Sequence, residues 1–204
     1  MGIALQTVIE FALTCLLIEL TPGPNMTYLA LVSARDGHRA GFAAIAGVAL
    51  GLEIIGLAAA LGLAETVAAS PRVFAVLRWG GVAYLCWLAW EAWRDNVARD
   101  ETPANGDKRY FVKGLITNLL NPKAAIFYIA VLPPFLDPGS NMAAQAAALS
   151  TLYVLVATAI HVTIVSLAGY LRPVFANPRV MGVSGKLFAG ALVGVAAWLA
   201  WSTR

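Results

Sequence analysis

Two short stretches of this chain combine prolines with polar side chains inside long apolar sequences. The first is LIELTPGPNMTYL, residues 17–29, and the second is GLITNLLNPKAAIFY, residues 114–128. Each proline removes a backbone donor and disfavours a helical conformation in the residue before it, so each stretch predicts a broken helix. The freed N–H groups at the start of a half-helix suit a carboxylate, and freed carbonyls suit an ammonium group or a cation. A zwitterionic amino acid would satisfy both.

The residues at the two breaks are the candidate substrate-binding set. They are Thr21, Pro22, Gly23, Pro24, Asn25, Asn118, Asn121, Pro122 and Lys123. The three asparagines either bind substrate or cap the broken backbone, and both roles stay open. Lys123 lies in the middle of an apolar sequence, where a charge is expensive unless it is paired. It is expected to bind a substrate carboxylate, to titrate, or to form a structural ion pair with Glu19 or Glu53.

Three further titratable residues are candidates for proton coupling. Glu19 lies three residues before Pro22 and is either a proton carrier or the partner of Lys123. Glu53, midway along the second apolar sequence, is the rival carrier. His161 has an ordinary pKa near neutrality and either relays protons or makes a hydrogen bond between helices.

No metal site, disulfide or cofactor is expected. The chain has two cysteines, Cys15 and Cys86, and both lie in apolar sequence without the spacing of a metal-binding or redox motif. No nucleotide-binding signature is present, which argues against a primary pump.

The rest of the sequence indicates an integral membrane protein that is entirely helical. Of its 204 residues, 60% are hydrophobic and only 12% are charged, about half the charged fraction of a soluble domain. A bilayer core needs roughly 20 apolar residues for each helical span. Six stretches qualify: Ile3 to Ala34, Gly41 to Ala64, Val73 to Trp93, Phe111 to Leu136, Met142 to Leu171 and Gly182 to Trp201.

The two breaks fall at matching places in two sets of three helices. A straight helix over the first stretch would be about 48 Å long, well beyond the hydrocarbon core. The first and fourth helices are therefore each expected as two half-helices. Three helices in each half require the halves to enter the membrane in opposite directions, which is the inverted-repeat plan of many secondary transporters. The predicted halves are residues 1–93 and 111–204, joined by a connecting loop at 94–110.

The distribution of lysine and arginine predicts the orientation. The loops after the first, third and fifth helices, with their flanks, hold ten of these residues, whereas the opposite side holds Arg72, Arg78 and Arg204. The positive-inside rule then places those three loops in the cytoplasm and both termini outside. The net charge of +3 is explained by this topology and by anionic lipid headgroups, with no need for a nucleic-acid partner. The spacing Gly47-x-x-x-Gly51 adds a face that allows close helix packing.

Four stretches of the chain closely resemble the lysine-exporter (LysE-type) translocator family, and most closely its homoserine/threonine efflux (RhtB-type) branch. They are TPGPN at residues 21–25, SARDGHRAGFAAIAGVALG at 33–51, SPRVFAVLRWGGVAYLCWLAWEAWR at 70–94 and GLITNLLNPKAAIFYIAVLPPF at 114–135. The resemblance implies a bacterial inner-membrane exporter of amino acids or their derivatives, driven by the proton-motive force and assembled as a homodimer. It places the candidate residues at both breaks in the functional core, and it leaves the substrate and the role of Glu53 open.

The resulting hypothesis is a secondary transporter, not an enzyme, that exports amino acids by proton antiport with alternating access around the two broken helices. The first alternative is a membrane thiol-relay protein, which needs two facing cysteines beside the breaks. The second alternative is an uncoupled channel or a membrane scaffold.

Overall fold

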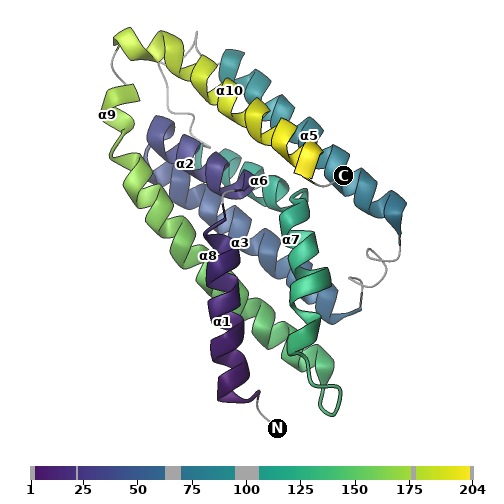
Figure 1. The fold of residues 1–204 in the computed structure, drawn as a ribbon. Helices are drawn as coiled ribbons and strands as arrows, with labels where there is room; N and C mark the ends of the chain where they lie inside the picture. The colour runs from purple at the N-terminus through teal and green to yellow at the C-terminus, as the bar shows by residue number, and fades with distance from the viewer. Residues whose placement is uncertain (1–2, 22, 63–69, 95–105, 176–177, 203–204) are drawn as a thin grey trace.

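The computed structural model describes residues 3–21, 23–62, 70–94, 106–175 and 178–202. Within these ranges the regular elements are all helical, and none is a strand. In chain order they are α1 (Leu5–Glu19), α2 (Pro24–Asp36), α3 (His38–Ala60), α5 (Pro71–Arg94), α6 (Gly106–Leu119), α7 (Pro122–Ile126), η1 (Phe127–Val131), η2 (Pro133–Phe135), α8 (Met142–Gly169), α9 (Arg172–Phe175) and α10 (Pro178–Ser202). Figure 1 shows how they are arranged.

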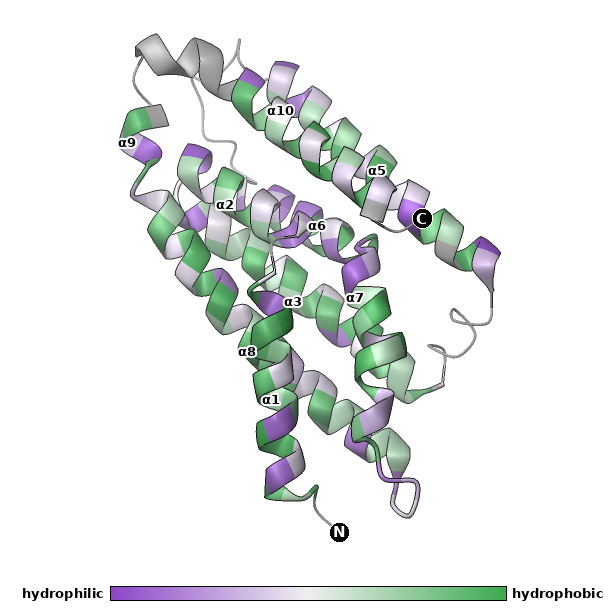
Figure 2. Cartoon of the chain, in the orientation of Figure 1, coloured by the Kyte–Doolittle hydropathy of each residue, from purple (hydrophilic) through white to green (hydrophobic). Residues whose placement is uncertain are grey.

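The expected class of an all-helical membrane protein is confirmed. Helices α3, α5 and α8 are each long and apolar enough to cross a bilayer. Two bent pairs meet the same test when each is taken as one span: α1 with α2, and α6 with the segment from α7 to η2. The last apolar helix among the described residues, Lys186–Trp201, is shorter and corresponds to the sixth predicted span. Apolar residues recur along the helices in Figure 2, and many large ones are exposed, such as Leu17, Trp90 and Leu155, which suits contact with lipid.

The first break lies where the TPGPN motif predicts it. Helix α1 ends at Glu19, α2 begins at Pro24, and the two axes are bent by 62°. Gly23 has an extended backbone (φ −157°, ψ 178°), as expected for a residue before a proline. Pro24 is the first residue of α2, where the absence of its N–H costs no helical hydrogen bond. Pro22 lies outside the described residues.

The second break matches the first. Helix α6 ends at Leu119, α7 begins at Pro122, and the bend is 49°. The sequence did not predict the short length of α7, which has only five residues and continues as the π-helix η1 and then as the 3-10 helix η2. The N–H of Leu132 donates a hydrogen bond to the carbonyl of Phe127, five residues earlier. This wide turn comes just before Pro133, which has no N–H to donate.

The close packing predicted from Gly47-x-x-x-Gly51 occurs inside the protein, between α3 and α6. A Cβ atom added to Gly47 would lie 2.0 Å from the carbonyl oxygen of Phe111, and one on Gly51 would lie 2.8 Å from Nδ2 of Asn118. From the other side, a Cβ on Gly114 would lie 2.2 Å from the carbonyl oxygen of Ala44. The backbones of the two helices therefore touch, and this contact fixes the position of the α6 end of the second break.

Helix α8 packs against the first three helices with one buried row of residues. This row repeats every four residues and faces α1, α2 and α3. Its members are Gln145, Leu149, Tyr153, Ala157, His161, Val165 and Gly169. Helices α5 and α10 lie side by side as a second layer along one edge of the molecule (Figure 1).

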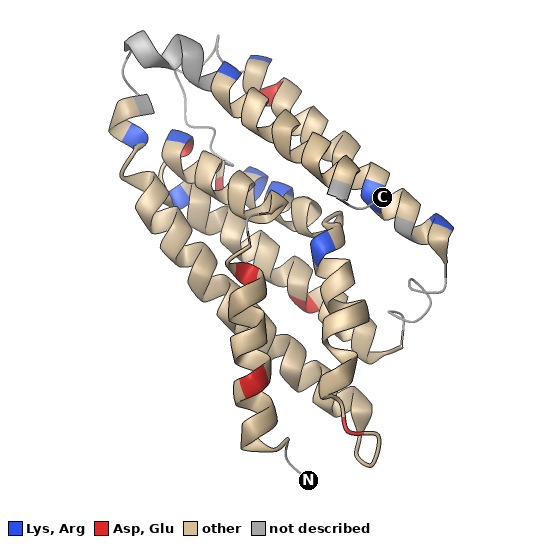
Figure 3. Cartoon of the chain, in the orientation of Figure 1, with Lys and Arg blue, Asp and Glu red and all other residues tan. Residues whose placement is uncertain are grey.

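Many of the Lys and Arg positions coloured in Figure 3 lie toward one end of the bundle, and others lie at the opposite end of α5. Arg39, at the start of α3, forms a salt bridge of 2.8 Å with Asp107 at the start of α6. Arg109 of α6 pairs with Glu91 near the end of α5, and Arg172 lies against the turn between α2 and α3. The helix termini that flank the predicted cytoplasmic loops therefore lie close together at this end of the bundle. Residues 106–110 of the predicted connecting loop belong to α6, and residues 95–105 lie outside the described part of the chain.

Candidate functional site

The structure brings the two helix breaks together around Glu19. This residue is the last of α1, and its side chain is only 5% exposed. Lys123, the second residue of α7, places Nζ 3.7 Å from Oε1 of Glu19 and donates a 2.9 Å hydrogen bond to the carbonyl oxygen of Thr21. The ion pair proposed from the sequence is therefore between Glu19 and Lys123, and it joins residues 104 positions apart.

The electrostatics of the helix ends do not explain this charge pair. A carboxylate at the end of a helix and an ammonium at the start of one both face an unfavourable helix dipole. Glu19 and Lys123 hold these unfavourable positions on α1 and α7. Each is compensated across the gap, Glu19 by the ammonium and Lys123 by the carboxylate and the Thr21 carbonyl. Such an arrangement in a membrane protein points to a functional site.

Helix α8 supplies two more groups to the same carboxylate. The Tyr153 hydroxyl donates a 2.7 Å hydrogen bond to Oε1 of Glu19, and Nε2 of His161 lies 3.6 Å from Oε2. That distance is slightly too long for a hydrogen bond, and Nε2 has no hydrogen-bond partner although His161 is only 1% exposed. His161 therefore faces the Glu19 carboxylate from another helix, and both interpretations of this residue, a proton relay and a link between helices, stay open.

A pair of asparagines links the two breaks a second time. Nδ2 of Asn25, in the first turn of α2, donates a 2.7 Å hydrogen bond to Oδ1 of Asn118 in the last turn of α6. Both side chains are buried, and the other amide atoms, Oδ1 of Asn25 and Nδ2 of Asn118, have no partner. Because buried amide groups are rarely left unpaired, these atoms are available to a ligand or to water.

Asn121 has the capping role that was one of its two alternatives. It is the N-cap of α7, and its side-chain oxygen accepts a 3.0 Å hydrogen bond from the N–H of Lys123. Pro122 comes next as the first residue of that helix, in the position that prolines favour. Helix α2 differs, since its N-cap is Gly23 and no side chain caps its first turn.

Some of these groups line a small cavity of about 10 Å³, whereas His161 and Asn118 do not. Its lining includes Glu19 and Gly23, Asn25 and Met26 from the first break, Asn121, Lys123 and Ala124 from the second, and Leu52 and Tyr153. This volume is about what one water molecule needs, so the cavity is closed to an amino acid in this conformation.

Tyr153 is a site residue that sequence reasoning missed. It precedes His161 by eight residues, which places both on the same face of a helix. That spacing was the available signal, because two polar aromatic side chains on one face of an apolar span are expected to share surroundings.

Glu53 lies elsewhere. Its carboxylate accepts a 3.3 Å hydrogen bond from the Thr151 hydroxyl, it is only partly buried, and it does not line the cavity at the breaks. Of the three predicted candidates for proton coupling, Glu19 and His161 are thus in the cluster and Glu53 is outside it.

The described residues contain no group of three or more His, Cys, Asp or Glu side chains that could hold a metal ion. Cys15 is buried on α1 and Cys86 is exposed on α5, so these two thiols do not form the facing pair that a thiol relay needs. The site offers one buried carboxylate, one ammonium, a histidine, a tyrosine hydroxyl and two amides, which can bind a zwitterion and hold a proton.

Comparison with known proteins places the chain in a family of transporters. A sequence model described as LysE type translocator matches residues 16–203. The homoserine/homoserine lactone efflux protein of Salmonella typhimurium is 31% identical over 195 residues, which cover 93% of this chain and 94% of that protein. An uncharacterized membrane protein of Vibrio cholerae is 28% identical over 94% of this chain and 95% of its own length.

A second uncharacterized membrane protein, from Pseudomonas aeruginosa, is 35% identical over 63% of each chain. No solved structure matches. The names among these relatives describe translocation and efflux across a membrane and no enzymatic reaction. The family model covers almost the whole chain, and the efflux protein aligns along nearly its full length, so the protein belongs to the LysE type translocator family.

Proposed function

We propose that this protein is a secondary transporter that exports an amino acid or a close derivative from the cytoplasm in exchange for protons. The observation that carries the proposal is the pair of the buried Glu19 with the partly buried Lys123, which joins the two helix breaks and is completed by Tyr153 and His161. Membership of a translocator family supports the transport role, and a relative named for homoserine and homoserine lactone efflux supports the substrate class.

The two charges of the pair match the two charges of an amino acid. Lys123 and the uncapped first turn of α2 would bind the substrate carboxylate, while Glu19 would bind the substrate ammonium. A proton neutralises Glu19 and so competes with the ammonium for the same carboxylate. Because proton and substrate exclude one another at Glu19, the expected coupling is exchange and not cotransport.

His161 and Tyr153 give Glu19 the neighbours that a proton exchange needs. Nε2 of His161 can hold a proton 3.6 Å from Oε2, and the Tyr153 hydroxyl keeps Oε1 oriented. Both come from the buried row of α8, so a shift of α8 against α1 would change the surroundings of the carboxylate. Alternating access requires such a link between the position of α8 and the protonation of Glu19.

The contacts between helices support the proposed inverted repeat. In the proposed halves, the second helices are α3 and α8, and the third helices are α5 and α10; each of these pairs is in contact. The first helix of each half also packs on the second helix of the other half, as α1 and α2 on α8 and α6 on α3. A pseudo-twofold axis that relates residues 1–93 to residues 111–204 produces this pattern, with the two breaks meeting near it.

The orientation in the proposal places the charged end of the bundle in the cytoplasm and both termini outside. The salt bridges of Arg39 and Arg109 at that end are consistent with the positive-inside rule. The location is the bacterial inner membrane and the assembly is a homodimer, as the family resemblance implies. An uncoupled channel is the competing function, and it differs in having flux that neither saturates nor depends on a proton gradient.

The test uses purified protein in liposomes and a panel of labelled solutes: homoserine, homoserine lactone, threonine, lysine, leucine and cysteine. Uptake is measured with and without an imposed pH gradient. The proposal predicts saturable transport of at least one of these amino acids or derivatives, accelerated by a proton gradient of the opposite direction and lost in Glu19→Gln. Saturable flux that ignores the gradient would contradict the antiport, and a lack of saturation would indicate a channel.

A further inference from the structure

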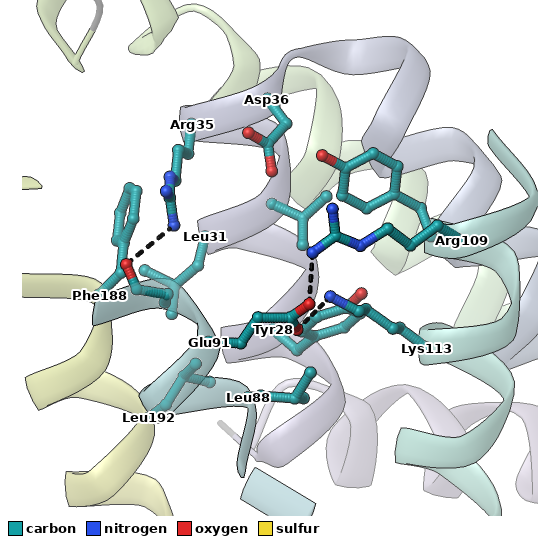
Figure 4. Close-up of a pocket in the computed structure, with 13 residues that line it drawn as sticks. Tyr28, Leu31, Arg35, Asp36, Leu88, Glu91, Arg109, Lys113, Phe188 and Leu192 are labelled. Atoms are coloured by element: carbon teal, nitrogen blue, oxygen red, sulfur yellow. Dashed lines mark hydrogen bonds and ion pairs between the residues drawn. The ribbon is translucent and has the colours of Figure 1, made fainter. Parts of the chain in front are cut away.

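A larger cavity lies at the charged end of the bundle, between α2, α5, α6 and α10. Its volume is about 70 Å³, compared with about 10 Å³ at the helix breaks. Figure 4 shows the side chains that line it, and we call it the charged chamber. One water molecule needs roughly 10–15 Å³ on this scale, so the chamber has room for several waters or for a small amino acid.

Tyr28 marks the chamber as a binding site. Its side chain is only 4% exposed, it lines the chamber, and its hydroxyl group has no hydrogen-bond partner among the described residues. A buried hydroxyl without a partner costs free energy that a phenylalanine in the same place would avoid. The residue also lies one turn after Asn25 on α2, the helix that begins at the first break.

The charges around the chamber match the head group of an amino acid. Glu91 of α5 accepts hydrogen bonds from Arg109 and Lys113 of α6. Arg35 of α2 donates a 3.5 Å hydrogen bond to the carbonyl oxygen of Ala92. Among the described residues that line the chamber, three are cations (Arg35, Arg109 and Lys113) and two are acids (Asp36 and Glu91), which is an excess of one positive charge within that set. That excess favours a ligand with a carboxylate.

Apolar side chains complete the chamber. Leu31 and Leu88, Phe188 and Leu192 lie among its lining residues, and the guanidinium group of Arg35 lies 5.8 Å from the centre of the Phe188 ring. A site with charged groups on one side and apolar groups on the other binds the head group and the short side chain of an amino acid separately.

We propose that the charged chamber is a second substrate site, which receives the amino acid from the cytoplasm before it moves to the helix breaks. The substrate carboxylate binds Lys113, Arg109 and the Tyr28 hydroxyl, and the substrate ammonium binds Glu91. The site therefore selects compounds with a free carboxylate. This inference rests on the proposed export function and its orientation, and it adds the step that precedes Glu19.

The test compares wild type, Tyr28→Phe and the control Tyr170→Phe, which changes an exposed tyrosine at the end of α8. Transport of labelled homoserine is measured in liposomes from each side of the protein, together with equilibrium binding to the protein in nanodiscs. We expect Tyr28→Phe to raise KM from the cytoplasmic side about tenfold, as for loss of a hydrogen bond to a charged group, with little change in kcat. Tyr170→Phe should match wild type.

A misfolded variant is excluded by its Tm, since removing an unpartnered hydroxyl should leave the Tm of Tyr28→Phe equal or higher. A second variant tests the carboxylate preference: wild type should bind homoserine more tightly than homoserine lactone, and Lys113→Gln should lose this preference while Lys113→Arg keeps it. An unchanged KM and unchanged binding in Tyr28→Phe would overturn the inference. If the wild-type protein binds homoserine through Tyr28 but does not transport it, the second substrate site stands and the proposed export function is refuted.

Discussion

Replacing Lys123 by methionine should abolish export while the protein still inserts and accumulates. The substitution keeps an unbranched side chain, one atom shorter, and removes the charge that lies 3.7 Å from Glu19. It also removes the donor to the Thr21 carbonyl. The remaining Glu19 carboxylate would be buried without its cation, and breaking a buried ion pair in this way typically costs about 3–5 kcal/mol.

The structure also gives the size of the coupling between the two residues. At 3.7 Å and an effective dielectric constant of about 20, the attraction of two unit charges is about 4.5 kcal/mol. Because Tyr153 and His161 also face Glu19, we take the lower end of the range for breaking a buried pair, about 3 kcal/mol. For a chain of this size, 3 kcal/mol corresponds to a decrease of roughly 6–12 °C in Tm.

The assay is a double-mutant cycle of Glu19→Gln and Lys123→Met, read out as Tm in detergent and as transport in liposomes. Each single variant should lower Tm, and the double variant should recover most of the loss because neither charge is then left alone. All three should fail to export. Glu10→Gln is the matched control, since Glu10 is an exposed residue of the same helix, and it should behave as wild type. Additive losses of Tm in the double variant would refute the ion pair, and export by Lys123→Met would remove this residue from the mechanism.

Three further predictions test other features of the structure. Gly47→Ala should lower Tm by several degrees because its Cβ would lie 2.0 Å from a backbone oxygen of α6, whereas Gly190→Ala, with no atom within 4 Å, should have little effect. Tyr153→Phe should slow export and shift its pH dependence by removing the 2.7 Å hydrogen bond to Glu19, and an unchanged pH profile would contradict this role. Glu53→Gln should retain export that depends on pH, because Glu53 lies outside the cluster; loss of the pH dependence would make it the proton carrier.

The helix breaks could be predicted from sequence because proline acts through its own covalent structure. Pro24 and Pro122 begin new helices in positions that need no N–H, and the residues before them leave the helical conformation. The spans could be predicted because the length of an apolar stretch is likewise a local property of the sequence. The boundaries of α3, α5 and α8 differ from the predicted spans by only a few residues.

The composition of the site depended on contacts that no local pattern determines. Lys123 had two carboxylates available in the sequence, and the choice of Glu19 over Glu53 depends on the fold, which brings the start of α7 near the end of α1. Tyr153 joins the site only because the buried row of α8 faces α1, and an almost uniformly apolar helix gives little indication of which face is buried. The π-helix η1 escaped prediction for a similar reason, since its apolar sequence suits an ordinary helix equally well.

The charged chamber could not be predicted from sequence either. Arg109 and Lys113 were counted only among the lysines and arginines that predict orientation. Glu91 and Tyr28 were given no role, and Tyr28 is one of six tyrosines in the chain. Their meeting depends on the crossing of α2 with α5, α6 and α10, which brings distant residues to one cavity.

The most direct test of the central claim is whether a transported amino acid occupies the cavity between the two breaks. Met26 lines that cavity, so the variant Met26→Cys, in a background with Cys15 and Cys86 replaced by serine, reports on it by its rate of alkylation. We predict that the transported amino acid slows this alkylation at concentrations near its KM, while a cysteine at the exposed position Leu13 of α1 reacts at an unchanged rate. Alkylation of Met26→Cys that is insensitive to every transported solute would contradict the claim that substrate binds where the two broken helices meet.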